Sequence, residues 1–263
     1  MIILKTESDL QAMRPACRLA GLVRDEVAAF VGPGVTTLMI DQYAAERIAS
    51  YGARSAFLGY RVGGRKYPCH LCISVNEQVV HGLGTERRVD FGDIVSLDVG
   101  VVYNGFIGDT ARTVPVGGCG LEAQRLLDVT EQALYEGIAA AQPGNHVVDI
   151  SRAVQQFVER NGYSVVREFV GHGVGRSMHE EPQVPNYVER GKATEKLKPG
   201  MTIAIEPMVN AGGPNVKVLK DGWTVVTEDG QLSAHFEHTV LITEHGSEIL
   251  TCHEKTASKL KAA

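Results

Sequence analysis

The chain has 263 residues, of which 44% are hydrophobic and 22% charged, and its formal net charge is −5. This composition is typical of a globular protein, and no run of basic residues exceeds two, which argues against nucleic acid as the main partner. No apolar run approaches the ~20 residues of a membrane-spanning helix, and the first ten residues fit neither a signal peptide nor an anchor. The five scattered cysteines then favour reduced thiols in the cytoplasm.

The chain opens with two predicted helices that have counterparts later in the sequence. An amphipathic run over residues 10–30 is followed by a Pro-Gly turn and by a second helix that ends near residue 52. The same order recurs with helices predicted over 121–141 and up to residue 162. The matched positions, 110 residues apart, are Pro33-Gly34 with Pro143-Gly144, and Gly52 with Gly162. One match would be chance, whereas several at a constant offset indicate an internal repeat.

A strand after each helix pair supports the repeat. "GDIVSLD" (92–98) and "GMTIAIE" (200–206) both place a carboxylate six residues after a glycine, at the end of an alternating run. Two halves, about 10–119 and 120–251, each with two helices and a sheet, are typical of an α+β domain with a pseudo-two-fold repeat. We therefore expect a single domain over residues 1–263.

The stretch from residue 94 to 110 predicts a hairpin that brings two aspartates together. Asn104-Gly105 strongly favours a two-residue turn, which pairs Gly100 with Asp109 across the strands. Asp98 lies two residues from Gly100 and therefore on the same face, so the carboxylates are diagonal neighbours, ~7 Å apart at Cβ or less. Carboxylates in an apolar setting repel each other unless a cation lies between them. A pair of divalent ions would suit this spacing.

The second half supplies further candidate ligands. Glu206 ends an alternating run, and Glu237 lies inside one β-rich run, on the same face as His235. His172 stands between two glycines, which allow a close approach of backbone or ligand. With the hairpin aspartates these residues make an oxygen-rich set, which suits Mn, Fe, Co or Zn better than a sulfur-ligated structural site. Any one acid could instead be an ordinary paired or exposed side chain, but the set as a whole is harder to explain in that way.

Four stretches of the sequence carry a family resemblance when they are taken together. They read "SLDVGVVYNGFIGDTART", "VGHGVGRSMHEEPQV", "KPGMTIAIEPMV" and "DGWTVVTEDGQLSAHFEHTVLIT". In this combination the chain resembles the type I methionine aminopeptidases from about residue 5 to 251. The resemblance implies the pita-bread fold, in which two related halves pack helices on a curved antiparallel sheet. It also implies a metallo-exopeptidase that removes N-terminal methionine when the second residue is small.

The resemblance further implies a centre of two divalent ions, drawn from Co, Mn, Fe, Zn and Ni. Asp98 would bind one ion, His172 and Glu206 would bind the other, and Asp109 and Glu237 would bridge the two. Such ions lower the pKa of a bound water, so that it attacks the amide near neutral pH with Glu206 as the proton acceptor.

Other site residues follow from the same resemblance. His81 and His179 match the two non-ligand histidines that act on the scissile amide and help to stabilise the oxyanion. The methionine pocket is expected to include Tyr60, Tyr67, Cys72, Met178 and Trp223. Met178 stands where the family usually has Phe, and the segment 60–72 looks longer than the usual loop, so the aromatic that closes the pocket stays open. Cys69 begins a C-x-x-C pair in this loop, for which zinc binding or redox chemistry is the alternative.

The resemblance names nascent polypeptides as partners, with docking on the ribosome left open, and we expect a cytoplasmic monomer that binds no membrane. Two alternatives stay open: a proline-specific or other aminopeptidase of the same fold, and a non-catalytic pita-bread protein that only binds partners. Proline-specific relatives carry an extra N-terminal domain, for which residues 1–20 leave no room. Non-catalytic relatives lose metal ligands, whereas all five positions are filled here.

Overall fold

The computed structural model of the protein describes residues 1–189 and 191–252. The α-helices are α1 (Glu7–Phe30), α2 (Thr37–Ser50), α3 (Leu121–Ala140) and α4 (Val147–Arg160). Thr6 starts α1, because its hydroxyl accepts a hydrogen bond from the Asp9 amide while the Asp9 carboxylate accepts one from the Thr6 amide. No helix in the described part of the chain is long and apolar enough to cross a membrane.

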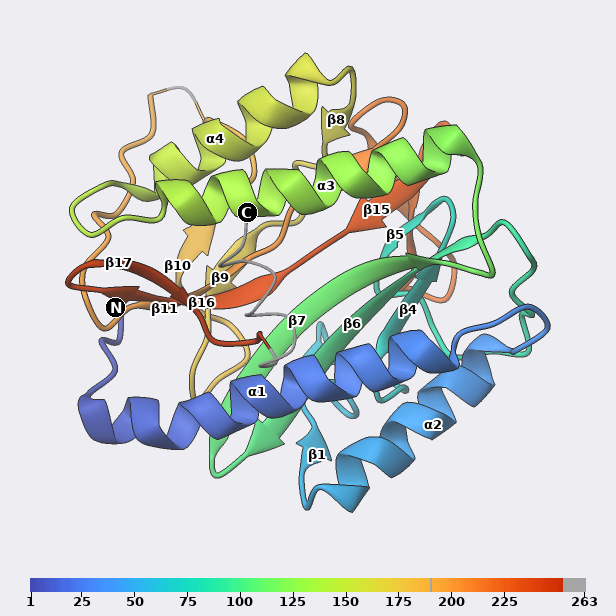
Figure 1. Ribbon diagram of the computed structural model, residues 1–263, viewed down its shortest axis with the longest axis horizontal. Coiled ribbons are helices and arrows are strands. Elements are labelled where there is room, and N and C mark those ends of the chain that lie inside the picture. The colour runs from blue at the N-terminus through green and yellow to red at the C-terminus, as the bar shows by residue number, and fades with distance from the viewer. Residues whose placement is uncertain (190, 253–263) are drawn as a thin grey trace.

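The helices form two pairs over the sheets, α1 beside α2 and α3 beside α4 (Figure 1). The turn inside each pair contains a glycine with positive φ, 85° at Gly34 and 92° at Gly144. Each pair also ends at such a glycine, with φ of 68° at Gly52 and 86° at Gly162. These are the positions matched at an offset of 110 residues in the sequence. Their common backbone geometry supports our proposal that one domain is built from two related halves.

The first half contains the longest strands, β6 (Ile94–Tyr103) and β7 (Phe106–Pro115), which pair as an antiparallel hairpin. Its turn is Asn104-Gly105, with φ of 52° and 76°. The register pairs Gly100 with Asp109, so the predicted hairpin and its face of two aspartates are confirmed. Two further strands, β1 (Arg54–Ser55) and β4 (Cys72–Val75), pair with the other edge of β6.

The second half contains a five-stranded sheet in the order β10-β9-β11-β16-β17. Its strands are β9 (Gly171–Gly173), β10 (Glu180–Val184), β11 (Thr202–Ile205), β16 (His238–Thr243) and β17 (Gly246–Ile249). Three small sheets complete the described strands. They are β8 (Ser164–Val165) with β12 (Met208–Asn210) and β15 (Ser233–His235); β5 (Gln78–Val80) with β13 (Val216–Val218) and β14 (Val225–Thr227); and β2 (Arg61–Val62) with β3 (Arg65–Lys66).

Each helix pair covers its own apolar core. One cluster lies between α1, α2 and the first-half strands and includes Val23, Ile40 and Leu97. Another lies between α3, α4 and the second-half strands and includes Leu134 and Ile203. A third cluster draws residues from both halves, so the boundary between the halves is itself partly apolar.

The two halves are joined along β7. Ala111 on this strand exchanges two backbone hydrogen bonds with Glu237 of the second half. The Thr239 hydroxyl donates to the Asp109 carbonyl at 2.8 Å and accepts a bond from the Asp109 amide at 3.3 Å. These bonds fix the backbone on both sides of the boundary, where the site described next is found.

Candidate metal centre and active site

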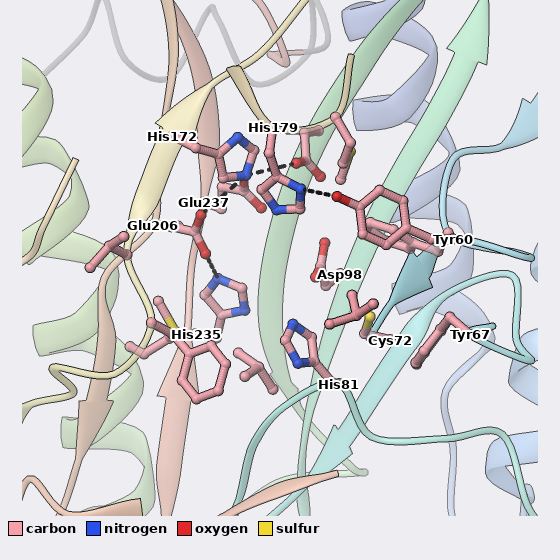
Figure 2. A pocket seen from close by; sticks show the side chains of 18 of the residues that line it. Tyr60, Tyr67, Cys72, His81, Asp98, His172, His179, Glu206, His235 and Glu237 are labelled. Carbon is pink, nitrogen blue, oxygen red and sulfur yellow. Dashed lines mark hydrogen bonds and ion pairs between the residues drawn. The ribbon is translucent and has the colours of Figure 1, made fainter. Parts of the chain in front are cut away.

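A cavity of about 270 Å³ opens between the two halves. Figure 2 shows side chains from both halves pointing into it. All twelve predicted site residues line the cavity: Tyr60, Tyr67, Cys72, His81, Asp98, Asp109, His172, Met178, His179, Glu206, Trp223 and Glu237. The structure thus brings the predicted set together, while the role of each residue stays a prediction.

The four carboxylates reach the cavity from different strands. Asp98 and Asp109 share one face of the β6–β7 hairpin, and Glu206 directly follows β11. Glu237 lies in the predicted β-rich run, at the point between β15 and β16. The run breaks into β15 and β16, because the backbone at residue 237 pairs with Ala111 of β7 instead. The break turns this carboxylate toward the hairpin aspartates.

Several of the carboxylate oxygens have no hydrogen-bond partner within residues 1–189 and 191–252. They are Oδ1 of Asp98, Oδ1 of Asp109 and Oε1 of Glu237, and each is buried. Ligand atoms of Asp109, His172 and Glu237 all lie within 4.8 Å of one another. Buried anionic oxygens without a donor are costly, and a bound cation would satisfy them. The residues present therefore fit a divalent metal centre.

Burial favours the protonated form of these carboxyl groups. Burial raises the pKa of Asp98 to about 7 and that of Glu206 to about 8. Burial, followed by the neighbouring carboxylates, raises the pKa values of Asp109 and Glu237 well above their ordinary range. Perturbed groups of this kind gather at functional sites, because a cation restores the charged form of each carboxyl.

The imidazole of His172 has one nitrogen bonded and one free to bind a cation. Its Nδ1 donates to the Gly173 carbonyl at 2.9 Å, which leaves the lone pair of Nε2 free. That Nε2 lies 3.6 Å from Asp109 Oδ2 and 3.5 Å from Glu206 Oε1. Burial lowers the pKa of His172 to about 3, so the ring is neutral. A Cβ at Gly171 would clash with the Ala204 carbonyl, which explains why a glycine precedes this histidine.

The other end of the cavity is apolar. Tyr67 packs edge-on against Trp223 with ring centroids 5.2 Å apart, and against Phe57 at 6.4 Å. Cys72 and Met178 are buried in the same cluster. The Tyr67 hydroxyl, with its single proton, lies within hydrogen-bond distance of the carbonyls of Leu71 and Gly82, at 3.1 and 2.8 Å, so this ring forms part of a fixed wall.

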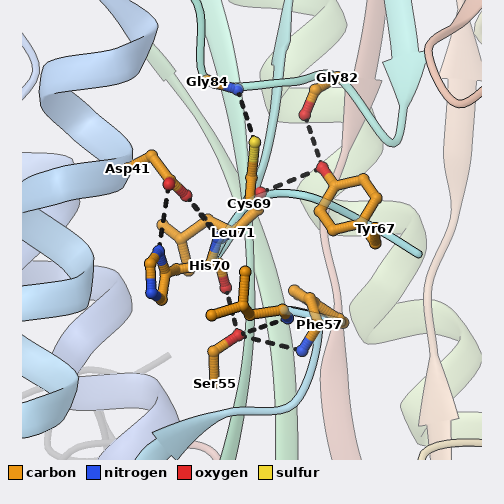
Figure 3. A network of polar contacts seen from close by, with 10 residues as sticks. Asp41, Ser55, Phe57, Tyr67, Cys69, His70, Leu71, Gly82 and Gly84 are labelled. Carbon is orange, nitrogen blue, oxygen red and sulfur yellow. Dashed lines mark hydrogen bonds and ion pairs between the residues drawn. The ribbon is translucent and has the colours of Figure 1, made fainter. Parts of the chain in front are cut away.

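A polar network holds that wall in place (Figure 3). The Asp41 carboxylate on α2 accepts hydrogen bonds from the backbone amides of His70 and Leu71 at 2.7 and 2.9 Å. Its second oxygen lies 3.2 Å from the His70 ring. Cys69 accepts a bond from the Gly84 amide through its sulfur. These contacts attach the C-x-x-C segment, residues 69–72, to α2 and to the backbone at Gly84. Both of its cysteines are free thiols.

The two predicted non-ligand histidines, His81 and His179, both line the cavity. The Tyr60 hydroxyl lies 2.6 Å from Nδ1 of His179, whose ring lies 4.3 Å from the His172 ring between centroids. His81 has a positive φ of 59°, and its ring packs edge-on against Phe169. Burial lowers the pKa of His81 to about 4.

Seven residues that line the cavity were not among the predicted site residues. They are Phe57, Val62, Val80, Phe169, Val170, Met208 and His235. The apolar ones give no local signal, because an apolar residue at a cavity resembles any core residue in sequence. His235 does give one, since it alternates with Glu237 and so faces the same side.

Similarity to known proteins identifies the class of this enzyme. The profile of metallopeptidase family M24 matches residues 11–244, and the chain belongs to this family. Methionine aminopeptidase 1 of Bacillus subtilis (strain 168) is 48% identical over 251 residues, which cover 95% of this chain and 99% of the relative.

Solved structures agree with this assignment. The crystal structure of methionine aminopeptidase from Rickettsia prowazekii matches with a TM-score of 0.92 at 40% identity, over 96% of this chain and 100% of that one. The prolidase from Pyrococcus furiosus is 24% identical and shares the fold, with a TM-score of 0.76, but this chain covers only 66% of it. The predicted family and the pita-bread fold are confirmed.

Proposed function

We propose that the protein is a methionine aminopeptidase, which removes the initiator methionine from nascent proteins and peptides when the second residue is small. One observation carries this proposal: a single cavity joins buried carboxylates that lack hydrogen-bond partners to an apolar wall of aromatic and sulfur-containing side chains. The identity of 48% to a protein named methionine aminopeptidase 1 supports the same activity.

Two divalent ions, from the group Co, Mn, Fe, Zn and Ni, are the cofactor we propose. Asp98 would hold one ion, His172 and Glu206 the other, and Asp109 and Glu237 both. When bound, such ions supply Lewis acidity, which polarises the scissile carbonyl and makes water acidic enough to lose a proton near neutral pH.

Glu206 is the residue we assign to proton transfer. Its carboxylate faces the cavity from the end of β11, and only 13% of the side chain is exposed. It accepts the proton of the attacking water and returns it to the leaving amine, so one group acts as base and then as acid.

The histidines are assigned to the scissile amide. If the Tyr60 hydroxyl donates to Nδ1 of His179, the proton of that ring is on Nε2, which can donate to the carbonyl oxygen as negative charge develops. His81 lies on the cavity wall as a neutral imidazole and would hold the amide from the other side.

The apolar wall is assigned to the methionine side chain. Tyr67, Trp223 and Phe57 offer ring edges and faces, with which a thioether makes favourable contacts. Cys72 and Met178 add polarisable sulfur to the same wall. A lysine or glutamate side chain would bury its charge here without a partner, so we expect strong selection for methionine.

We further propose that the enzyme acts as a monomer in the cytoplasm, on nascent polypeptides near the ribosome. The five free cysteines support a reducing compartment.

Peptide hydrolysis tests the proposed function directly. The protein is stripped of metal with EDTA and assayed with Met-Ala-Ser, Lys-Ala-Ser and Ala-Pro-Ser, with and without Mn²⁺ or Co²⁺. We expect release of the first residue from Met-Ala-Ser alone, and only with metal. Cleavage of Ala-Pro-Ser would instead identify a proline-specific peptidase, and metal binding without any cleavage would identify a binding protein.

A further inference from the structure

His235 is buried in the cavity wall with an unused nitrogen. Only 2% of the residue is exposed, and its Nε2 has no hydrogen-bond partner in the described part of the chain. This nitrogen faces Oε2 of Glu206 at 3.6 Å, as the dashed line in Figure 2 shows. A buried polar atom without a partner is uncommon, and one aimed at the proposed proton acceptor calls for an explanation.

The backbone of His235 is held firmly at the joint between the halves. Its amide donates to the Thr113 hydroxyl at 2.8 Å, and that hydroxyl donates to its carbonyl at 2.9 Å. Its Cα pairs with that of Met208 where β15 meets β12. From this fixed backbone the ring projects toward Glu206, which directly follows β11.

The Glu206 carboxylate lies between two imidazoles that differ in what they can offer. His172 faces Oε1 at 3.5 Å, but its ring proton is on Nδ1, so Nε2 cannot donate to Glu206. His235 faces Oε2 with an Nε2 that has no other partner. Oε1 of Glu206 therefore faces the lone pair of His172 Nε2, and Oε2 faces a potential donor, Nε2 of His235.

We propose that His235 is a positioning residue for Glu206: its Nε2–H donates a hydrogen bond to Oε2 and fixes the rotation of the carboxylate. Oε1 is then left facing His172 and the metal side of the cavity, where the proton transfer takes place. The inference rests on the proposed function, because it gives Glu206 the role assigned there.

Three substitutions at position 235 separate this role from a structural one. His235→Gln keeps an N–H donor at nearly the same reach, His235→Asn has the same amide on a shorter side chain, and His235→Leu fills the space without a donor. Each is assayed with Met-Ala-Ser at saturating Mn²⁺, and thermal unfolding reports on folding. We expect kcat to fall about 10- to 100-fold in the Leu and Asn variants with KM nearly unchanged, and to stay within about fivefold of wild type in the Gln variant.

Calorimetric titration of the metal-free variants with Mn²⁺ gives a readout that does not depend on peptide cleavage. The number of bound ions should be unchanged, while the affinity of the ion reached by Glu206 falls about tenfold in the Asn variant and recovers in the Gln variant. If the wild-type protein cleaved no peptide, the proposed function would fail. The Mn²⁺ affinities of the Asn and Gln variants would still show whether His235 positions Glu206.

Three results would overturn the inference. Loss of one bound ion in the Asn variant would make His235 a metal ligand. A Gln variant as impaired as the Asn variant would mean that the imidazole itself is needed. Wild-type kcat and metal affinity in the Asn variant would leave His235 with no influence on Glu206. Even if the Leu variant does not fold, the comparison of the Gln variant with the Asn variant still tests the inference.

Discussion

Ala111 and Glu237 exchange two backbone hydrogen bonds across the joint between the halves, with N···O distances of 3.3 and 3.0 Å. Asp109 lies two residues before Ala111 on β7, so its side chain is on the same face of that strand. The backbone thus sets a carboxylate of the first half beside one of the second. The fold thus places carboxylates of the proposed metal centre side by side, on backbone that is itself held by hydrogen bonds, as precise catalytic sites require.

Glu237→Gln removes one charged oxygen that we assign to both ions. We expect kcat/KM for Met-Ala-Ser to fall at least about a hundredfold, even with added Mn²⁺. The melting temperature of the metal-free variant should not drop, because a buried carboxyl that repels its neighbours becomes a neutral amide. Glu244→Gln, an exposed acid after β16, is the matched control. Turnover above about a hundredth of wild type in the Glu237 variant would count against the bridging role.

The metal-free protein should lose stability as the pH rises from about 6.5 to 8. The folded pKa values of about 7 for Asp98 and 8 for Glu206 lie above the ordinary values of 3.8 and 4.5. In this window the folded state holds protons that the unfolded state has already released, so the free energy of unfolding falls as the pH rises. Buried neutral histidines act in the opposite direction, but only below about pH 6.5, the ordinary histidine pKa.

Thermal unfolding after EDTA treatment checks this pH dependence. The melting temperature should be lower at pH 8 than at pH 6.5, and Asp98→Asn should make the difference smaller by removing one of the titrating groups. Added Mn²⁺ should stabilise the protein most at pH 8, since ligands must be deprotonated to bind it. A melting temperature that rises with pH in the absence of metal would contradict the buried, protonated carboxyls.

Asp41→Ala should damage the methionine pocket without touching the metal centre. It removes the acceptor for the amides of His70 and Leu71, which hold the loop that carries Tyr67 and Cys72. Hydrogen bonds to a charged group contribute about 1.5–3 kcal/mol each, so we expect a loss of at least about 2 kcal/mol in the free energy of unfolding.

The same substitution should raise KM for Met-Ala-Ser about tenfold, which is about 1.4 kcal/mol of lost binding. Calorimetry should show unchanged Mn²⁺ binding. Glu46→Ala, an exposed acid on the same helix, serves as the control and should behave as wild type. If KM stayed constant while stability fell, the Asp41 network would serve the fold alone and not the pocket.

Selection at the second residue of the substrate should be steep. The rings of His172 and His179 lie 4.3 Å apart between centroids, and both line the cavity together with the carboxylates. A β-branched second residue is stiff at χ1 and cannot swing away from them. In competition, Met-Ala-Ser should be cleaved faster than Met-Ile-Ser by about two orders of magnitude or more. Equal rates would show that this space is not restrictive.

The chemistry of the site could be predicted from local sequence wherever a regular element carried it. Asn104-Gly105 fixed the register of β6 and β7 and therefore the common face of Asp98 and Asp109. The position of Glu237 could not be predicted in this way. Its strand breaks because of long-range pairing with Ala111, which no local pattern reveals.

The pocket was harder to predict than the carboxylates. Phe57 and Phe169 line the cavity but look like ordinary core residues in the sequence. Tyr60 was predicted as pocket wall, and its contact with Nδ1 of His179 adds a polar role that depends on folding across the halves. A charged residue in an apolar strand can be recognised in the sequence, because burying its charge costs free energy unless it has a function or a partner. An apolar residue in a pocket wall cannot be recognised in this way, because most apolar residues are buried in the core.

Anomalous X-ray scattering from crystals grown with Mn²⁺ tests the central claim most directly. That claim is that the carboxylates of both halves and His172 form one metal centre. We predict two anomalous peaks in the cavity, each within coordination distance of Asp109 and Glu237, with Asp98 on one side and His172 and Glu206 on the other. An empty cavity at saturating Mn²⁺, or peaks bound only to surface acids, would contradict the account.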